Sequence, residues 1–477
     1  MAAPIVGTRA AIREALRTKS GLFGFGMLGV IVGVVIIIPF IAPYDIVRAW
    51  GDVAAWTDNP RNAAPDWIDA FTDRKQSRNI ILNWDDFSKG ESNTSQDLKI
   101  IILQGRWEFK YATFPSDYRL QIRANWASSP IQVTVDWKRP DGESVRMFEG
   151  LVTRQAPSID VLPLSADSQR NDPQARVRNW ALSLGADDID SVRDVKPHVT
   201  LFAEVGAGML DPNRARVLPY ITGRYSLTVT AIARNTTDTV DARFTSYGEV
   251  YGLAGTDHLG RDLFVGLIWG APVALAFGTA AAGITVFSQV ILGALGAYYG
   301  RRSDEIIQRA ADFFIIIPVL PILILIGQLY EVTIVAILFI VVLFNIVGGT
   351  TKVVRSITLQ VREELYVEAA RSYGASRRRI LFRYIIPRTM PYTFALLSLS
   401  VPSFIFLEAS LSFLGLGDPV IPTWGAIMGD ASRNGALYNG LWWWIALPAS
   451  GIVFTTIAFA FLGYSFDKVL NPRLREE

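Results

Sequence analysis

The sequence contains no cysteine and only two histidines, His198 and His258. Without cysteine, disulfides, thiolate metal sites and a cysteine nucleophile are excluded, and two histidines are too few for a histidine-rich metal site. The dipeptide Gly-Lys does not occur either. A phosphate-binding loop of the form G-x-x-x-x-G-K-[ST] is therefore excluded, and the chain cannot bind ATP in that way. The net charge of +2 is smaller than a dedicated nucleic-acid-binding protein would carry.

Half of the 477 residues are hydrophobic, yet 19% are charged. The mean hydropathy of +0.27 fits a chain that is part membrane protein and part soluble domain better than either alone. A chain of this length has room for more than one domain. We therefore expect a membrane part and a soluble part.

A first membrane span is predicted at residues 22–42, which are apolar without a single charge and long enough to cross about 30 Å of hydrocarbon. The basic residues before it place the N-terminal segment, residues 1–21, in the cytoplasm. A signal peptide is the alternative interpretation. The run is long, however, no A-x-A cleavage site appears, and Pro43 follows directly. We therefore expect a span that is retained.

Residues 43–252 differ from the apolar run before them, because apolar and polar residues alternate there as in half-buried strands. The alternation is clearest at three segments: 118–122, 131–137 and 225–229. Pro140-Asp141-Gly142 predicts a turn, and a helix is expected from Pro173 to Leu184. We interpret the region as an extracytoplasmic, mainly β, sandwich-like domain inserted after the first span. Motifs of known active sites are absent from it, so no catalytic residue is assigned.

Five further spans are predicted in residues 253–477. The second runs from about Val273 to Tyr299, the fifth from Thr393 to Leu416 and the sixth from Trp442 to Gly463. Between them, residues 313–349 would form a single helix roughly 55 Å long, too long for a bilayer. This stretch must therefore fold back near Tyr330-Glu331 into spans three and four, and Pro318 should kink the third.

Glu408 is the one acidic residue well inside a predicted span. Such residues face a helix bundle or a water-filled interior rather than lipid. Glu408 is therefore a candidate gate or pathway residue. The alternative is a structural carboxylate that satisfies backbone groups near Pro402.

A strongly basic stretch, residues 366–391, lies between two apolar runs. It predicts two short helices around a break at Gly374, because glycine takes the left-handed conformation that ends a helix at the lowest cost. Ser376 can cap the second helix, and we expect Pro387 and Pro391 to end it. The arginines in this stretch place it in the cytoplasm.

Two motifs give a resemblance to a known family. Glu368-Ala369-Ala370, followed by Gly374 and later by Ile386-Pro387, resembles the EAA loop of ABC importer permeases, with Tyr384 where isoleucine is usual. Gly255-Thr256-Asp257, followed by Gly260-Arg261-Asp262, resembles the G-T-D-x-x-G-R-D segment of C-type permeases in the dipeptide and oligopeptide importer branch. Here glycines allow tight turns, and Asp262 can favour the start of the following helix. The two motifs in this order make the resemblance specific, but it leaves the large insert unexplained.

The resemblance implies a type I ABC importer permease with six transmembrane helices and both termini in the cytoplasm. Residues 352–391 would be the cytoplasmic coupling loop, which lodges in a groove of the ATPase subunit. The chain would form half of a path for di- or oligopeptides in the cytoplasmic membrane. Its partners would be a second permease, two ATP-binding subunits and an extracytoplasmic substrate-binding protein. ATP and Mg would be bound by the ATPase subunits, so neither a cofactor, a metal nor nucleic acid is expected in this chain.

Three alternatives stay open. The same branch includes permeases for other solutes, such as oligosaccharides or nickel complexes. A secondary transporter would couple to ions through charged groups inside the spans, where Glu408 is almost alone. A membrane-anchored receptor would use the outer β domain for binding; one or two spans would then suffice, and the EAA loop would have no role.

Overall fold

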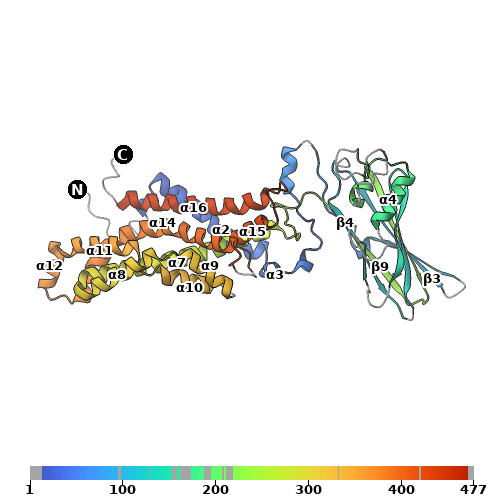
Figure 1. Ribbon diagram of the computed structural model, residues 1–477. Coiled ribbons are helices and arrows are strands. Elements are labelled where there is room, and N and C mark those ends of the chain that lie inside the picture. The colour runs from blue at the N-terminus through green and yellow to red at the C-terminus, as the bar shows by residue number, and fades with distance from the viewer. Residues whose placement is uncertain are drawn as a thin grey trace. The chain divides into compact units, whose positions relative to one another are not determined.

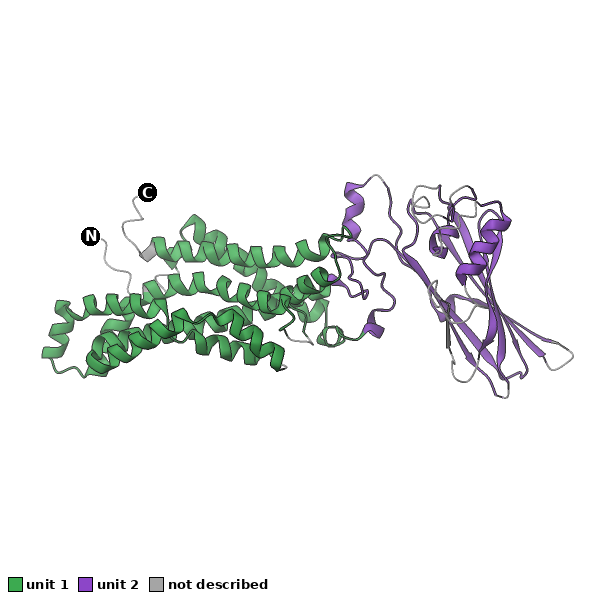
Figure 2. Ribbon diagram, in the orientation of Figure 1, with its two compact units in different colours: residues 1–52, 264–477 green, residues 53–263 purple. Residues whose placement is uncertain are grey.

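The computed structural model describes residues 13–72, 74–94, 98–127, 129–152, 158–161, 173–186, 195–206, 209–210, 219–330, 332–417 and 421–470. The chain divides into two compact units, which Figure 2 draws in different colours. Met1–Asp52 and Phe264–Glu477 form the helical unit, and Val53–Leu263 form the β unit. The β unit begins and ends about ten residues later than the insert expected at 43–252.

Helices build the helical unit (Figure 1). In chain order they are α2 (Lys19–Ile41), α3 (Tyr44–Arg48), α7 (Leu263–Tyr299), α8 (Arg301–Ile316), α9 (Val319–Leu329), α10 (Ile334–Phe344), α11 (Gly349–Arg362), α12 (Leu365–Ser372), α13 (Arg377–Ile380), the π-helical turn η4 (Leu381–Ile385), α14 (Ile386–Phe413), α15 (Trp424–Arg433) and α16 (Trp443–Leu470). Among the described helices, four are long and apolar enough to cross a membrane: α2, α7, α14 and α16. The pairs α8–α9 and α10–α11 are long and apolar enough when each pair is taken as one bent span.

One kink and one break of the central helices fall at the predicted places, whereas the 45° bend between α10 and α11 was not predicted. Pro318 directly precedes α9, and the bend between α8 and α9 is 69°. The break predicted near Tyr330 separates α9 from α10, and Thr333 caps α10 by accepting a hydrogen bond from the N–H of Ala336 (3.3 Å). Both the kink and the break are therefore confirmed.

Glycines set the closest approaches between helices. A Cβ atom on Gly24 of α2 would lie 2.9 Å from the backbone nitrogen of Leu462 in α16. One on Gly293 of α7 would lie 2.6 Å from the carbonyl oxygen of Thr351 in α11. Lipid tails are as apolar as leucine, so helices inside a bilayer associate through close packing rather than through hydrophobic burial. The helical unit is packed in this way.

Two antiparallel sheets form the β unit. The first has the strand order β1-β9-β4-β7 and the second β2-β3-β8-β5-β6. The strands are β1 (Ile80–Leu82), β2 (Ser88–Thr94), β3 (Leu98–Phe109), β4 (Asp117–Asn125), β5 (Ile131–Lys138), β6 (Ser144–Val152), β7 (Ser158–Val161), β8 (Gly223–Ala233) and β9 (Thr239–Tyr247). Short helical segments accompany them: η1 (Val53–Trp56), η2 (Asp66–Phe71), η3 (Trp84–Asp86), α4 (Pro173–Ser183) and α5 (Pro197–Thr200).

The two sheets enclose one hydrophobic core, as in a sandwich. The three alternating segments of the sequence are β4, β5 and β8, and their predicted inward residues are all buried: Tyr118, Leu120, Ile122, Ile131, Val133, Val135, Trp137, Tyr225, Leu227 and Val229. At the centre, the ring of Trp107 lies 5.0 Å from that of Trp137 and 4.7 Å from that of Phe244. The prediction of a β-rich region is therefore confirmed.

The predicted turn at residues 140–142 connects β5 to β6. Gly142 has a φ of 98°, and the N–H of Arg139 donates to the carbonyl oxygen of Glu143 (2.9 Å). The carboxylate of Asp141 lies 2.8 Å from Nη2 of Arg139, which is buried and also donates to the carbonyl oxygen of Ala203 (2.9 Å). The turn therefore neutralises a buried cation as well as reversing the chain.

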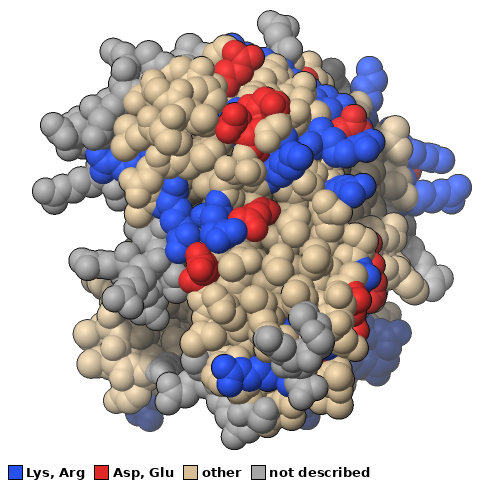
Figure 3. All heavy atoms as spheres, turned by 90° about the vertical axis from the view of Figure 1, so that its right-hand side faces the viewer, with Lys and Arg blue, Asp and Glu red and all other residues tan. Residues whose placement is uncertain are grey.

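Charged side chains of both signs are mixed on the surface of the β unit. On the face drawn in Figure 3, lysine and arginine side chains lie close to aspartate and glutamate side chains. One such pair joins neighbouring strands, with Nε of Arg146 3.0 Å from Oδ1 of Asp136. Interspersed charge of this kind is typical of a soluble, solvated surface.

Asp117, the first residue of β4, is an exception because its carboxyl is half-buried. Burial raises its pKa from 3.8 to about 6, although the N–H of Tyr118 and the charge of Arg61 act in the opposite direction. The folded state therefore disfavours the ionised form. The contribution of Asp117 to stability is complete below about pH 4 and is lost as the pH rises through 6.

We predict that Asp117→Asn stabilises the isolated β unit, residues 53–263, by on the order of 2 kcal/mol at pH 7.5. The gain should shrink to nothing between pH 6 and pH 4, because the wild-type carboxyl is then protonated. Urea unfolding followed by tryptophan fluorescence at a series of pH values measures it. Asp85→Asn, at an exposed site, is the control and should show no such trend. An equal gain at pH 4 and pH 7.5 would contradict the prediction.

Candidate functional site

The basic stretch folds as two helices around a break at Gly374, as predicted. Gly374 has a φ of 78°, and its N–H donates to the carbonyl oxygen of Arg371 (3.0 Å). The N–H of Ala375 donates to the carbonyl oxygen of Ala370 (3.0 Å). These two bonds make a Schellman motif, which ends a helix with one residue in the left-handed region. The residue type at this position is therefore dictated by the backbone.

The second helix begins as predicted but does not end there. The hydroxyl of Ser376 accepts a hydrogen bond from the N–H of Arg379 (3.4 Å) and caps α13. The chain then passes through η4 directly into α14, which contains Pro387 and Pro391. The prediction that these prolines end the helix is wrong. Pro387 falls in the first turn of α14, after a wide π-turn, where a missing N–H costs little.

We name residues 365–385 the elbow, and one of its faces is buried against α7 and α11. Four of its apolar side chains are at most 1% exposed: Val367, Ile380, Leu381 and Ile385. They share one apolar cluster with Val286, Val290 and Ala294 of α7 and with Val354 of α11. Apolar packing therefore holds the elbow to both helices.

The opposite face of the elbow is exposed and carries both charge and apolar surface. Glu368 and Ala369 of the E-A-A motif are exposed, as are five arginines: Arg371, Arg377, Arg378, Arg379 and Arg383. Among them Tyr373 is 92% exposed. Of the remaining motif residues, Ala370 and Ile386 are buried and Pro387 is exposed. Large exposed apolar side chains within a polar rim are typical of a protein interaction surface.

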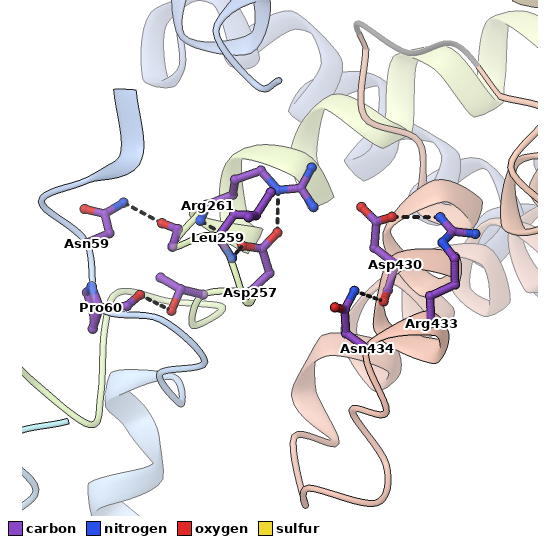
Figure 4. Close-up of polar contacts among 10 residues, drawn as sticks. Asn59, Pro60, Asp257, Leu259, Arg261, Asp430, Arg433 and Asn434 are labelled. Atoms are coloured by element: carbon purple, nitrogen blue, oxygen red, sulfur yellow. Dashed lines mark hydrogen bonds and ion pairs between the residues drawn. The ribbon is translucent and has the colours of Figure 1, made fainter. Parts of the chain in front are cut away.

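The second motif is fastened to the segment that enters the β unit (Figure 4). The hydroxyl of Thr256 donates to the carbonyl oxygen of Pro60 (2.7 Å), and Nδ2 of Asn59 donates to the carbonyl oxygen of Gly260 (3.0 Å). Backbone bonds run alongside, such as that from the N–H of Thr256 to the carbonyl oxygen of Ala63 (2.9 Å). Residues 59–64 and 255–262 together are named the clasp.

Inside the clasp, Asp257 is fully buried and hydrogen-bonded. Its carboxylate accepts from the N–H groups of Leu259 (2.8 Å) and Arg261 (2.9 Å) and forms an ion pair with the Arg261 guanidinium. Gly255 and Gly260 have φ values of 75° and 82°, so the predicted tight turns are confirmed. Asp262 directly precedes α7. The motif therefore joins the segment that leaves the β unit to the segment that enters it.

Sequence reasoning missed Asn59 and Pro60, the partners of this motif. They lie about 200 residues away in the chain, and one of them contributes only a carbonyl oxygen. Pairing between a side chain and a distant backbone atom leaves no local pattern. The pairing of Asp257 with Arg261, four residues apart, is the one signal that could have been found.

Glu408 is only 3% exposed within α14. Its carboxylate accepts hydrogen bonds from the hydroxyls of Ser412 (2.7 Å) and Thr423. Thr423 in turn caps α15 by accepting from the N–H of Ala426 (3.2 Å). The buried acid therefore ties α14 to the start of α15, and its role as a gate stays a prediction.

α15 packs tightly on α14 through two glycines one helical turn apart. A Cβ atom on Gly425 would overlap the carbonyl oxygen of Ala409, and one on Gly429 would lie 2.5 Å from that of Phe413. This small-xxx-small spacing allows two helix backbones to approach closely. At the other end of α15, Arg433 pairs with Asp430 (2.7 Å; Figure 4).

The class of protein follows from these features. Membrane-length helices, glycine contacts between them and a basic elbow continuous with one of these helices define a helical membrane protein. Comparison with known sequences gives the family. Residues 289–476 match the family described as "Binding-protein-dependent transport system inner membrane component". The matched region lies outside the β unit.

Curated relatives are named as transport system permease proteins. The oligopeptide transport system permease protein OppC of Bacillus subtilis (strain 168) is 35% identical over 225 residues, which are 46% of this chain and 72% of the relative. The dipeptide transport system permease protein DppC of the same organism is 35% identical over 224 residues (46% and 68%). The glutathione transport system permease protein GsiD of Pectobacterium atrosepticum is 32% identical over 230 residues (46% and 72%). The chain belongs to the family of inner membrane components of binding-protein-dependent transport systems.

We predict that Gly425→Leu destabilises the helical unit, because a larger side chain must push α15 away from α14. The cost should be about 1–3 kcal/mol. It is measured as a lower midpoint of thermal unfolding of the full chain in detergent. Gly283→Leu in α7 is the matched control, since no atom lies within 4 Å of its Cβ position. Equal midpoints for the two variants would contradict the close contact.

Proposed function

We propose that this chain is the permease subunit of an ATP-driven ABC importer. It forms half of the path by which di- or oligopeptides, delivered by a substrate-binding protein, cross the cytoplasmic membrane. The observation that carries the proposal is the elbow, which exposes charge and a large aromatic side chain while its other face packs on α7 and α11. The relatives named for oligopeptides, dipeptides and glutathione support the substrate class.

The partners in this proposal are a second permease, two ATP-binding subunits and an extracytoplasmic substrate-binding protein. ATP and Mg bind to the ATP-binding subunits, because this chain lacks a phosphate-binding loop. The coupling loop, expected at residues 352–391, is the elbow together with the adjoining ends of α11 and α14. Exposed Glu368 and Tyr373 contact the ATPase, and buried Val367 and Ile385 pass its movement to the spans. Closure of the ATPases then turns the path from inward-facing to outward-facing.

The proposed topology has six spans: α2, α7, α8–α9, α10–α11, α14 and α16. The membrane-length helices and the two bent pairs support this number. An even number of spans puts both termini on one side of the membrane, and the elbow lies on that side too. The arginines of the elbow make this side the cytoplasm. The β unit, inserted between the first two spans, is then extracytoplasmic.

The topology predicts which side of the membrane each exposed residue faces, and the cysteine-free chain makes single cysteines informative. Glu143→Cys is exposed in the β5–β6 turn and leaves the pair of Asp141 and Arg139 intact. It should react with a membrane-impermeant maleimide on intact spheroplasts. Arg378→Cys in the elbow should react only after permeabilisation. Labelling of Arg378→Cys on intact spheroplasts would refute the six-span arrangement.

Coupling is tested at Gly374. Because no atom lies within 4 Å of its Cβ position, a substitution there acts through the backbone alone. Gly374→Val should cost about 1–3 kcal/mol locally and misplace α13. Gly374→Asn is the matched control, because asparagine tolerates the left-handed region.

Both Gly374 variants should assemble with the ATPases, as judged by co-purification. In proteoliposomes supplied with binding protein and peptide, Gly374→Val should lose transport and substrate-stimulated ATP hydrolysis, while Gly374→Asn keeps most of both. Wild-type transport by Gly374→Val would show that the elbow is not the coupling element.

A further inference from the structure

The β unit contains a cavity of about 400 Å³ that neither the family nor the proposed path accounts for. Residues from three parts of the unit line it: Val53, Trp56, Thr57, Asn59 and Arg61 from the entering segment, Ser116, Asp117, Arg119 and Tyr247 from β4 and β9 with the turn before β4, and Leu259 from the clasp. Cavities that bind small ligands measure about 300–1,000 Å³. This cavity is therefore large enough for a small solute.

Hydrogen bonds hold the walls of the cavity in place. The hydroxyl of Tyr247 donates to the carbonyl oxygen of Thr57 (2.6 Å). The next residue, Asp58, accepts two hydrogen bonds from Arg243 of β9 (2.7 and 2.8 Å). Asn59, itself part of the clasp, donates to the carbonyl oxygen of Gly260 (3.0 Å). The entering segment is thus fastened to β9 on one side and to the clasp on the other, so the cavity is part of a fixed structure.

The lining combines charges of both signs with two buried aromatic side chains. Asp117 and Arg119 are half-buried, Arg61 is exposed, and Trp56 and Tyr247 are buried. Arg61 acts on the Asp117 carboxyl electrostatically. Among the described residues, however, no ion pair within 4.0 Å joins Asp117 to a cation. A half-buried carboxylate without a paired cation is costly, and a ligand cation would offset that cost.

We propose that this cavity binds a short peptide as a zwitterion. The peptide carboxylate lies against the guanidinium group of Arg61, its ammonium group lies against Asp117, and Trp56 and Tyr247 contact the part in between. Guanidinium–carboxylate contacts are among the stronger hydrogen bonds in proteins, and they favour a ligand with a free carboxylate. The inference rests on the proposed function for its substrate class. It adds a binding site in the β unit, separate from the translocation path.

The first test measures which charges the ligand needs. The full chain in phosphatidylcholine nanodiscs is titrated by calorimetry with Ala-Ala, acetyl-Ala-Ala, Ala-Ala-amide and acetyl-Ala-Ala-amide at pH 7. Loss of either terminal charge should weaken binding about tenfold, and loss of both should weaken it further. Glycerophosphoethanolamine is included because a lipid headgroup is also a zwitterion. Equal binding of all four peptides, no binding of Ala-Ala, or tighter binding of the headgroup than of Ala-Ala would overturn the proposal.

The second test assigns each charge to its residue. Arg61→Gln should abolish the difference in affinity between Ala-Ala and Ala-Ala-amide. Asp117→Asn should abolish the difference in affinity between Ala-Ala and acetyl-Ala-Ala. Arg61→Gln should still distinguish Ala-Ala from acetyl-Ala-Ala, and Asp117→Asn should still distinguish Ala-Ala from Ala-Ala-amide. A misfolded chain would instead lose both differences in affinity. Arg224→Gln and Asp85→Asn, both at exposed sites outside the cavity, are the controls and should bind as wild type. Unchanged discrimination in Arg61→Gln and Asp117→Asn would place the peptide elsewhere.

Transport by the reconstituted importer separates this inference from the proposed function. Peptide transport without peptide binding in the β unit overturns the cavity site alone. Peptide binding with the predicted charge dependence, but without peptide transport, overturns the proposed function and leaves the site standing.

Discussion

A domain inserted into the loop between two helices must bring its two ends together, and the clasp meets this constraint. It joins residues 59–64 to residues 255–262 by side-chain and backbone hydrogen bonds and buries the ion pair of Asp257 and Arg261. Domains that tolerate insertion generally have neighbouring termini. The β unit has its own two sheets and its own hydrophobic core. The clasp is therefore the contact on which the inserted arrangement depends.

The parts that could be predicted from the sequence are those that depend on local chemistry. Strands β4, β5 and β8 face one core, so their apolar residues recur every second position. Gly374 and Ser376 mark a helix end and a helix start through their own backbone and hydroxyl. The continuous passage through η4 could not be predicted, because Pro387 and Pro391 indicate an end to the helix. Burial of Leu381 and Ile385 against α7 and α11 overrides that signal.

Helix contacts in the helical unit depend on glycine and on satisfied polar groups. Gly425 and Gly429 let α15 approach α14 closely, and Glu408 adds hydrogen bonds to Ser412 and Thr423 at the same contact. A buried acid in a span is tolerated only where donors satisfy it, because an unsatisfied polar group in an apolar medium is costly. Those two hydroxyls supply the donors. The contact between α14 and α15 thus accounts for the presence of an acid in this span.

One helix connects the two motifs that the sequence singled out. α7 begins at Leu263, immediately after the clasp, and continues for 37 residues, about 55 Å, to Tyr299. Near its far end, Val286, Val290 and Ala294 pack against the elbow. The same helix therefore packs against the elbow and follows the clasp directly in the chain. Leu259 of the clasp also lines the cavity, so one wall of the cavity lies four residues before the start of α7 in the chain.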